Sequence, residues 1–334
     1  MGALRGSGAC VSTAASRPWV AVGRPAALKV LARLADAHAH RGPIRLVAVT
    51  DAGAWRSAIA GARSVLVVGN PRRGPRSALP GLVVDDHGRP VPVGWLPDDC
   101  RLDVAVAAMT VVAARPSSSS PLLLFCDRVA RSTALLGELQ SVLIDRLPVH
   151  RWDAERVARH TLLEALGAGA GAALYSGCAT PKGWLAYGGV RGCDLAARPE
   201  PIGILLSLTC HTASRHRVGR SFAEQALAAG AAGAVLAATR AVRHKDNVAF
   251  AHALVAAVAR GITSIGDLVC APGVPATCRR LYRLVGDPGA RLVGAAGSVA
   301  ACAAVPAPAP TEAPPPLPAG WWPTTGEGRE NTMS

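Results

Sequence analysis

Two short apolar runs, each ending in a cysteine, are the most informative part of this sequence. Residues 171–178 are GAALYSGC, and residues 202–210 are IGILLSLTC. Each run has the length of a buried strand and reaches its cysteine where the sequence turns polar. The carboxyl ends of neighbouring parallel strands meet at one edge of a sheet, where ligands and chemistry collect. If the two strands are neighbours, Cys178 and Cys210 are expected to lie about 5–10 Å apart.

Helical and extended patterns alternate on both sides of these two runs. PLLLFCD (121–127) and AAGAVLAAT (231–239) predict strands, and residues 130–144 and 248–259 predict helices. Two helix starts are also expected, one capped by Asp153 over residues 154–166 and one with the capping-box pair Ser221 and Glu224. This alternation predicts an α/β fold, in which a mostly parallel sheet is flanked by helices.

The remaining residues divide into an N-terminal portion and a tail. Residues 1–120 are expected to form an N-terminal α/β portion, either separate or the first half of the same domain, with an irregular lead-in over 1–25. Within it, residues 44–50 and 64–70 read as strands, and residues 71–100 as a long excursion with a hairpin at Asp86–Gly88. Residues 121–294 form the main α/β domain. Residues 295–334 are rich in proline and polar residues, so a disordered tail is predicted.

Composition narrows the class of protein. The net charge is +14, but the arginines are scattered without a basic run, so no nucleic-acid partner is expected. No uninterrupted apolar stretch reaches the roughly 18 residues of a membrane helix, so no membrane association is expected. The nine cysteines are spread singly, without a C-x-x-C pair, which disfavours a metal site and a disulfide framework. We therefore expect a cytoplasmic protein without cofactor or metal; its oligomeric state stays open.

The residues around Cys210 are compatible with a reactive, nucleophilic thiol. TCHTAS (209–214) surrounds the thiol with polar side chains directly after an apolar run. A nucleophilic cysteine needs a partner that favours the thiolate and backbone N–H groups that hold an oxyanion. A cysteine at the end of a buried strand is, however, most often a small apolar core residue. Both interpretations stay open on the residues alone.

Four segments in fixed order resemble the caspase-like cysteine peptidases of the gingipain type, family C25 of clan CD, which are related to caspases and CHAT domains. They are ALYSGCATPKGW, ILLSLTCHTAS, SFAEQALAAGAAGAVLAATRAV and YRLVGDPGARL, within residues 120–294. The resemblance implies a caspase-like sandwich and peptide-bond hydrolysis through a thioacyl intermediate on Cys210. It also implies oxyanion donors at the backbone of Cys210 and Ala179, and a peptide or protein as substrate or binding partner. Gly286, Asp287 and Pro288 match an element that closes the domain, which we interpret as structural.

The chain departs from the family pattern at one decisive position. The catalytic histidine of the family corresponds to Cys178, and the glycine after it corresponds to Ala179. A thiol cannot replace imidazole as the general acid to a leaving amine near neutral pH. His211 and His216 are the candidates for a substitute base.

Three functions therefore stay open. The first is a cysteine peptidase that uses Cys210, and the second is a pseudopeptidase that acts as a binding or regulatory module. The third is a thiol redox sensor that pairs Cys178 with Cys210. Gly177, Trp184 and Tyr187 are expected to line a substrate groove in the first two. The acidic candidates for reading a basic substrate side chain are Asp194, Glu200 and Glu224.

Overall fold

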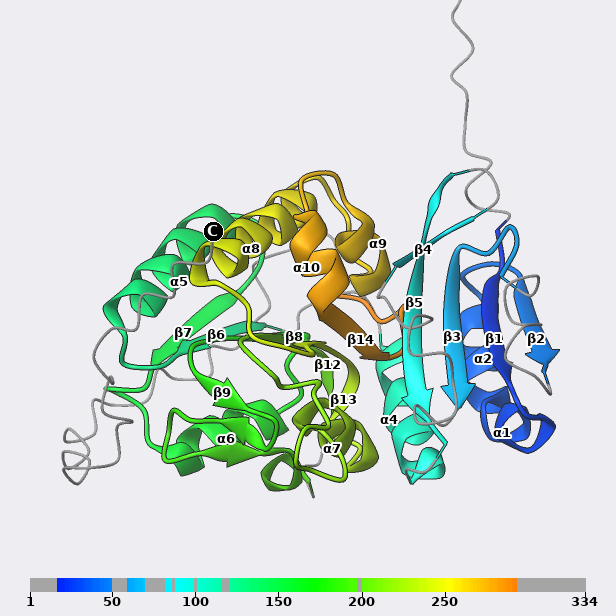
Figure 1. Cartoon of the computed structure of the whole chain (residues 1–334), viewed down its shortest axis with the longest axis horizontal. Helices are drawn as coiled ribbons and strands as arrows, with labels where there is room; N and C mark the ends of the chain where they lie inside the picture. Colours follow the sequence, from blue (N-terminus) through cyan, green and yellow to red (C-terminus); the bar gives the residue numbers. More distant parts are fainter. Residues whose placement is uncertain are drawn as a thin grey trace, which may run out of the picture.

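A single mixed sheet of eleven strands is the centre of the molecule (Figure 1). The computed structural model describes residues 17–49, 59–69, 82–85, 88–98, 101–115, 121–196 and 200–292. Ten strands follow the order β2-β1-β3-β5-β14-β13-β12-β8-β6-β7, and β4 pairs with β5. The strands are β1 (Trp19–Gly23), β2 (Ile44–Ala48), β3 (Ser64–Gly69), β4 (Leu82–Val84), β5 (Pro90–Pro97), β6 (Leu122–Cys126), β7 (Val149–Asp153), β8 (Ala172–Ser176), β12 (Ile202–Leu208), β13 (Ala232–Ala238) and β14 (Tyr282–Gly286).

Strand direction divides the sheet in two. The strands β6, β7, β8, β12 and β13 run parallel to one another, and β14 is antiparallel to β13. β14 is parallel to β5, and β5, β3, β1 and β2 are also parallel to one another. The sheet therefore continues from the N-terminal portion into residues 121–294, and the carboxyl ends of the two sets lie at opposite edges.

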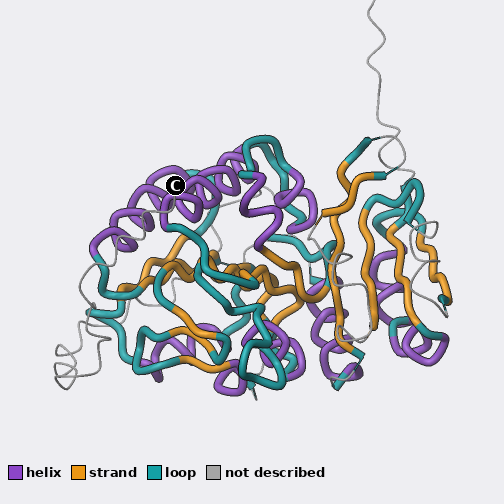
Figure 2. Tube along the Cα trace, in the orientation of Figure 1, coloured by secondary structure: helices purple, strands orange, loops and turns teal. Residues whose placement is uncertain are grey.

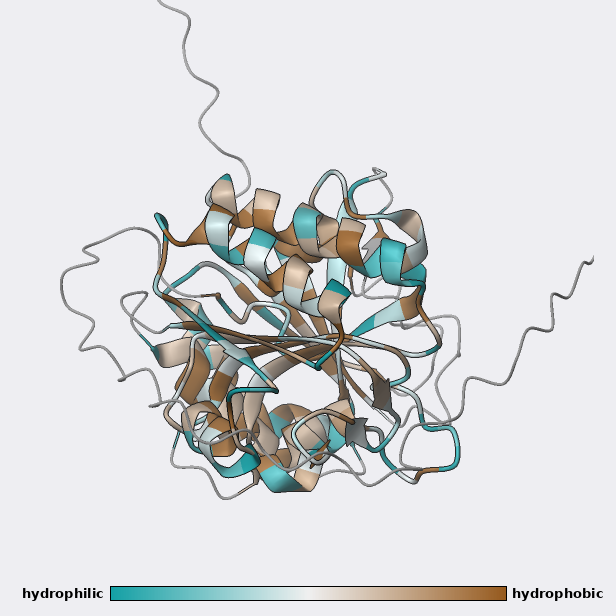
Figure 3. Cartoon of the chain, turned by 90° about the vertical axis from the view of Figure 1, so that its left-hand side faces the viewer, coloured by the Kyte–Doolittle hydropathy of each residue, from teal (hydrophilic) through white to brown (hydrophobic). Residues whose placement is uncertain are grey.

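Helices cover both faces of the sheet, and in Figure 2 they lie above and below the strands of residues 121–292. One face carries α1 (Pro25–Val30), α2 (Ala32–Ala39), α4 (Leu102–Ala114), α6 (Arg159–Gly167) and α7 (Phe222–Ala228). The other carries α5 (Ala130–Leu143), α8 (His244–Ala259), α9 (Ile265–Cys270) and α10 (Ala276–Leu281). The central strands are buried on both sides, which explains their continuous apolar sequences. Figure 3 shows these apolar strands between the two helical layers. The predicted α/β fold is confirmed.

Several predicted elements need correction. Trp19–Gly23, placed in the irregular lead-in, is the buried strand β1. Asp153 does not cap a helix, because it ends β7 and bonds to Arg151, and α6 begins only at Arg159. Ser221 and Glu224 do form the predicted capping box. The proposed turn residues Asp86 and His87 and the predicted disordered tail lie outside the described residues.

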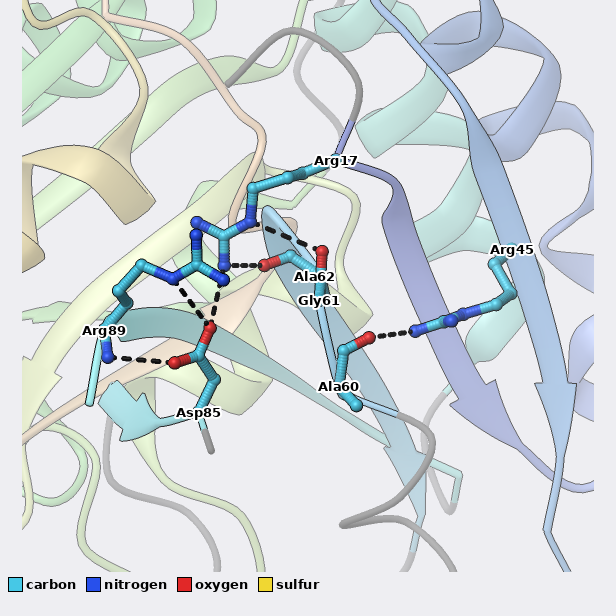
Figure 4. A network of polar contacts seen from close by, with 7 residues as sticks. All are labelled: Arg17, Arg45, Ala60, Gly61, Ala62, Asp85 and Arg89. Atoms are coloured by element: carbon cyan, nitrogen blue, oxygen red, sulfur yellow. Dashed lines mark hydrogen bonds and ion pairs between the residues drawn. The ribbon is translucent and has the colours of Figure 1, made fainter. Parts of the chain in front are cut away.

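An arginine–aspartate network fixes the β4–β5 hairpin to the start of β1 (Figure 4). The buried Asp85 carboxylate accepts hydrogen bonds from Arg17 at 3.2 Å and from the Arg89 Nε at 3.2 Å. Arg17 also donates to the Ala62 carbonyl at 2.7 Å, and Arg45 donates to the Ala60 carbonyl at 2.9 Å. These guanidinium groups therefore neutralise a buried carboxylate and satisfy loop carbonyls of the N-terminal portion.

The element after β14, the last strand in the sequence, contacts β1, the first strand, and the helix α2. Asp287 is buried, and its carboxylate accepts hydrogen bonds from His38 Nε2 at 2.8 Å, Trp19 Nε1 at 3.2 Å and the Gly289 N–H at 2.8 Å. The His38 ring stacks on Trp19 with centroids 4.8 Å apart. The contacts of Asp287 support the structural interpretation of this element.

Candidate functional site

The candidate site lies where the parallel strands β6, β8, β12 and β13 end. β8 and β12 are confirmed as neighbours, and their register pairs Ser176 with Leu208. Cys178 and Cys210 each lie two residues beyond this pair, so the structure brings the two cysteines together at one edge of the sheet. Cys178 is exposed and Cys210 is half-buried. None of the described helices is both long and apolar enough to cross a membrane.

The backbone at position 178 is held from three directions. The Cys178 N–H donates to Asp127 Oδ2 at 2.9 Å. Its carbonyl accepts from the Tyr175 hydroxyl at 3.2 Å and from the Leu185 N–H at 3.1 Å. A Cβ atom at Gly177 would lie 2.7 Å from both Asp127 Oδ2 and the Tyr175 hydroxyl. Glycine is therefore required before Cys178 by this close approach.

The Cys178 thiol is in a poor environment for a thiolate. Although the residue as a whole is exposed, partial desolvation raises the pKa of Cys178 above its ordinary value, and the Asp127 carboxylate raises this pKa further by its charge and a hydrogen bond. The Arg131 guanidinium acts in the opposite direction without offsetting these effects, and a charge on Cys210 adds to the increase. Cys178 therefore stays protonated near neutral pH and supplies neither a base nor a cation.

The Cys210 thiol is hydrogen-bonded to the backbone of the loop after β13. Its sulfur lies 3.6 Å from the Val242 carbonyl, to which it donates, and accepts the Val242 N–H at 3.4 Å. His211 has a left-handed backbone with φ of 63° and donates its N–H to the Arg240 carbonyl. In the part of the chain that the structure describes, neither the His211 ring nor the His216 ring hydrogen-bonds to Cys210. Among the described residues, no histidine ring hydrogen-bonds to the Cys210 thiol.

The Ala179 backbone has the orientation expected of an oxyanion donor. A small sheet of β9 (Ala179–Thr180), β10 (Gly183–Trp184) and β11 (Val190–Arg191) follows Cys178, with β9 at its edge. Because Leu185 donates to the Cys178 carbonyl, Ala179 and Trp184 form the next, non-hydrogen-bonded pair of the antiparallel ladder. The Ala179 N–H therefore points out of this sheet. Its part in catalysis stays a prediction.

Two expected groove residues are core residues instead. Trp184 is buried, stacks on Tyr175 with centroids 4.6 Å apart, and donates its Nε1 proton to Ser207. Tyr187 is also buried, and its hydroxyl donates to the Trp152 carbonyl. Neither ring lines a surface groove in this structure, because both pack inside the fold. Only Gly177 of the three lies at the surface edge.

A buried hydroxyl cluster supports the Cys210 loop and was not found from sequence. Ser207, Thr209 and Thr212 hydrogen-bond to one another at 3.1–3.3 Å, and Trp184 donates into the cluster. The signal was present as two hydroxyl residues at the end of a fully buried strand. Such residues must find partners inside the protein, and here they fix the chain on both sides of Cys210.

The three acidic candidates for a basic substrate side chain are already paired. Asp194 pairs with Arg159, Glu200 with Arg115 and Glu224 with Arg215, each at 2.7 Å. Glu224 is also buried and completes the capping box of α7. None of them presents an unpaired carboxylate to a substrate. Among the described residues, no group of three or more His, Cys, Asp or Glu side chains is arranged to hold a metal ion.

The strand-end cysteines and the sheet define a caspase-like cysteine peptidase fold. Residues 130–293, a little under half of the chain, match the model of peptidase family C25. No curated protein matches the sequence at a significant level.

Two solved structures of gingipain R agree with this fold. The crystal structure of the Arg-specific cysteine proteinase gingipain R (RgpB) is 12% identical, with a TM-score of 0.63 over 83% of this chain and 78% of that chain. The complex of Porphyromonas gingivalis RgpB pro- and mature domains is 12% identical, with a TM-score of 0.64 over 83% and 79%. The Saccharomyces cerevisiae separase–securin complex has a TM-score of 0.48 at 14% identity, over 68% of this chain and 16% of that chain.

Proposed function

We propose that this protein is a catalytically impaired C25 peptidase, a pseudopeptidase that binds a peptide or protein at the Cys178–Cys210 edge. The observation that carries the proposal is the pair of thiols at this edge. A protonated thiol occupies the family histidine position, and the Cys210 sulfur bonds to the Val242 backbone. We place its action in the cytoplasm, where thiols stay reduced.

The chemistry of amide hydrolysis explains the impairment. Attack of a Cys210 thiolate on a peptide carbonyl forms a carbon–sulfur bond, and the leaving amine must then receive a proton as the carbon–nitrogen bond breaks. Imidazolium supplies that proton in a cysteine–histidine pair, whereas Cys178 has a raised pKa and donates poorly. Loss of the base from such a unit typically lowers the rate by several orders of magnitude.

The third function, a thiol redox sensor, is less well supported. The two cysteines are adjacent, so a disulfide between them is geometrically reasonable. Thiol oxidation proceeds through the thiolate, however, and the raised pKa of Cys178 works against its formation. The peptide-binding reading needs no thiolate at Cys178 and is therefore preferred.

A peptidyl acyloxymethyl ketone tests the proposal directly, because it alkylates a cysteine only when the site activates the thiol. We expect the wild-type chain to be labelled at Cys210 no faster than Cys193, an exposed cysteine of the described chain. Mass spectrometry of tryptic peptides gives the two rates. Rapid labelling that Cys210→Ala abolishes would instead identify an active peptidase, with the exposed cysteine as the internal control.

A further inference from the structure

A third strand end lies beside the two cysteines. Ser207 of β12 is in register with Ala237 of β13, so Cys210 and Arg240 each lie three residues beyond this pair. The His211 N–H donates to the Arg240 carbonyl at 3.2 Å, which ties the two strand ends together. Val242, which holds the Cys210 sulfur, belongs to the same loop. Arg240 is therefore the cationic neighbour of Cys210 on the side away from Cys178.

A second arginine lies close enough to Arg240 to feel its charge. Arg283 of β14 is in register with Ala237 and is half-buried. Its guanidinium donates to the carbonyls of Arg280 and Tyr282, and within the described residues it has no carboxylate partner. Burial, followed by the charge of Arg240, lowers the pKa of Arg283. Two like charges that interact in this way repel each other, so a bound anion would stabilise the pair.

Three further cationic side chains lie around this edge. Arg131 is close enough to act on the Cys178 thiol, and Lys182 and Arg217 are exposed. Within the described residues, none of these three side chains forms an ion pair. The carboxylates nearby are engaged inside the protein: Asp127 by the Cys178 and Val129 amides, Glu224 by Arg215, and Asp246 by Arg243. The edge therefore presents unpaired positive charge.

We propose that this site selects a peptide with an aspartate or glutamate side chain, which Arg240 and Arg283 receive beside Cys210. This inference rests on the proposed peptide-binding function and names the substrate class. Guanidinium groups bind carboxylates through strong charge-assisted hydrogen bonds, which a neutral or basic side chain cannot form. A peptide is favoured over a nucleic acid because the outward Ala179 N–H on the edge strand β9 suits an extended main chain.

Matched peptides test the selection. Three fluorescein-labelled hexapeptides differ only in a central Asp, Asn or Arg, and fluorescence anisotropy gives their dissociation constants. The Asp peptide is expected to bind at least about tenfold more tightly than the Asn peptide, and the Arg peptide most weakly. Arg240→Ala is expected to remove the preference for Asp over Asn, and Arg240→Glu to reverse the order of Asp and Arg.

Arg260→Ala is the matched control. Arg260 is exposed at the C-cap of α8, whose 16 residues begin next to the site and extend roughly 24 Å away from it. This variant is expected to keep the full preference. Thermal unfolding of each variant confirms that the fold is intact.

The outcomes separate this inference from the proposed function. Failure of all three peptides to bind would contradict the binding function itself. Equal binding of the three peptides, unchanged in Arg240→Ala, would overturn the acidic selection and leave the function standing. Tighter binding of a single-stranded 20-nucleotide DNA, lost in Arg240→Ala, would overturn the selection in favour of a nucleic-acid partner.

Discussion

The Cys178→His variant is expected to hydrolyse fluorescein-labelled casein about 10²–10⁴-fold faster than the wild-type chain, the usual contribution of a general acid–base. Position 178 already has the backbone geometry for this role, because Asp127, Tyr175 and Leu185 hold it from three directions. An imidazole there would lie beside Cys210, and the Asp127 carboxylate would favour its cationic form. The imidazolium would then stabilise the Cys210 thiolate and protonate the leaving amine.

Two further variants make this result specific. Cys178→Asn introduces a polar side chain without a base and is expected to leave casein intact. Cys178→His combined with Cys210→Ala is expected to be inactive, which assigns the hydrolysis to Cys210. Ala179→Gly in the Cys178→His background restores the second family residue. If the folded Cys178→His protein hydrolysed casein no faster than the wild-type chain, more than the base would have been lost.

The parallel strands around the site were predictable because burial on both faces makes them continuous apolar runs. β5 was missed because PVPVGWLP contains three prolines, which remove ladder donors and normally indicate a loop or an edge strand. In the structure Pro92 is paired only with the short strand β4, and the β14 contact begins at Gly94. Pro92 therefore does not interrupt the pairing of β5 with β14.

Only the part of the candidate site that follows from the pairing of neighbouring strands could be predicted from the sequence. Cys178 and Cys210 follow neighbouring strands by the same number of residues, so their proximity follows from the sequence pattern. The contact of Asp127 with the Cys178 amide depends on how a loop folds back, which no spacing reveals. Trp184 was misplaced because an aromatic residue after a short loop reads the same whether it lines a groove or fills the core. Arg283 lies near Arg240 because β14 pairs antiparallel with β13, and the alternation of helices and strands in the sequence did not predict an antiparallel strand there.

The Asp287→Ala variant is expected to lower the free energy of unfolding by about 3–5 kcal/mol, because it removes a buried carboxylate that accepts three hydrogen bonds. The substitution leaves His38, Trp19 and the Gly289 N–H without their acceptor, and each unsatisfied buried donor adds to the cost. Urea unfolding followed by tryptophan fluorescence measures the change. Asp36→Ala removes an exposed carboxylate from α2, the helix that carries His38, and is expected to change stability by less than about 0.5 kcal/mol.

The pH dependence identifies the charge of Asp287 as the source of this stability. Burial raises the pKa of Asp287, but the charge and hydrogen bond of His38, with the Gly289 N–H and Trp19 bonds, outweigh burial and lower the pKa overall. A carboxyl with a lowered pKa in the folded state contributes fully above its ordinary pKa of about 3.9 and loses that contribution as the pH falls. The stability difference between wild type and Asp287→Asn is therefore expected to shrink between pH 6 and pH 3. A constant difference over that range would show that shape and hydrogen bonds, not charge, hold the last strand to the first.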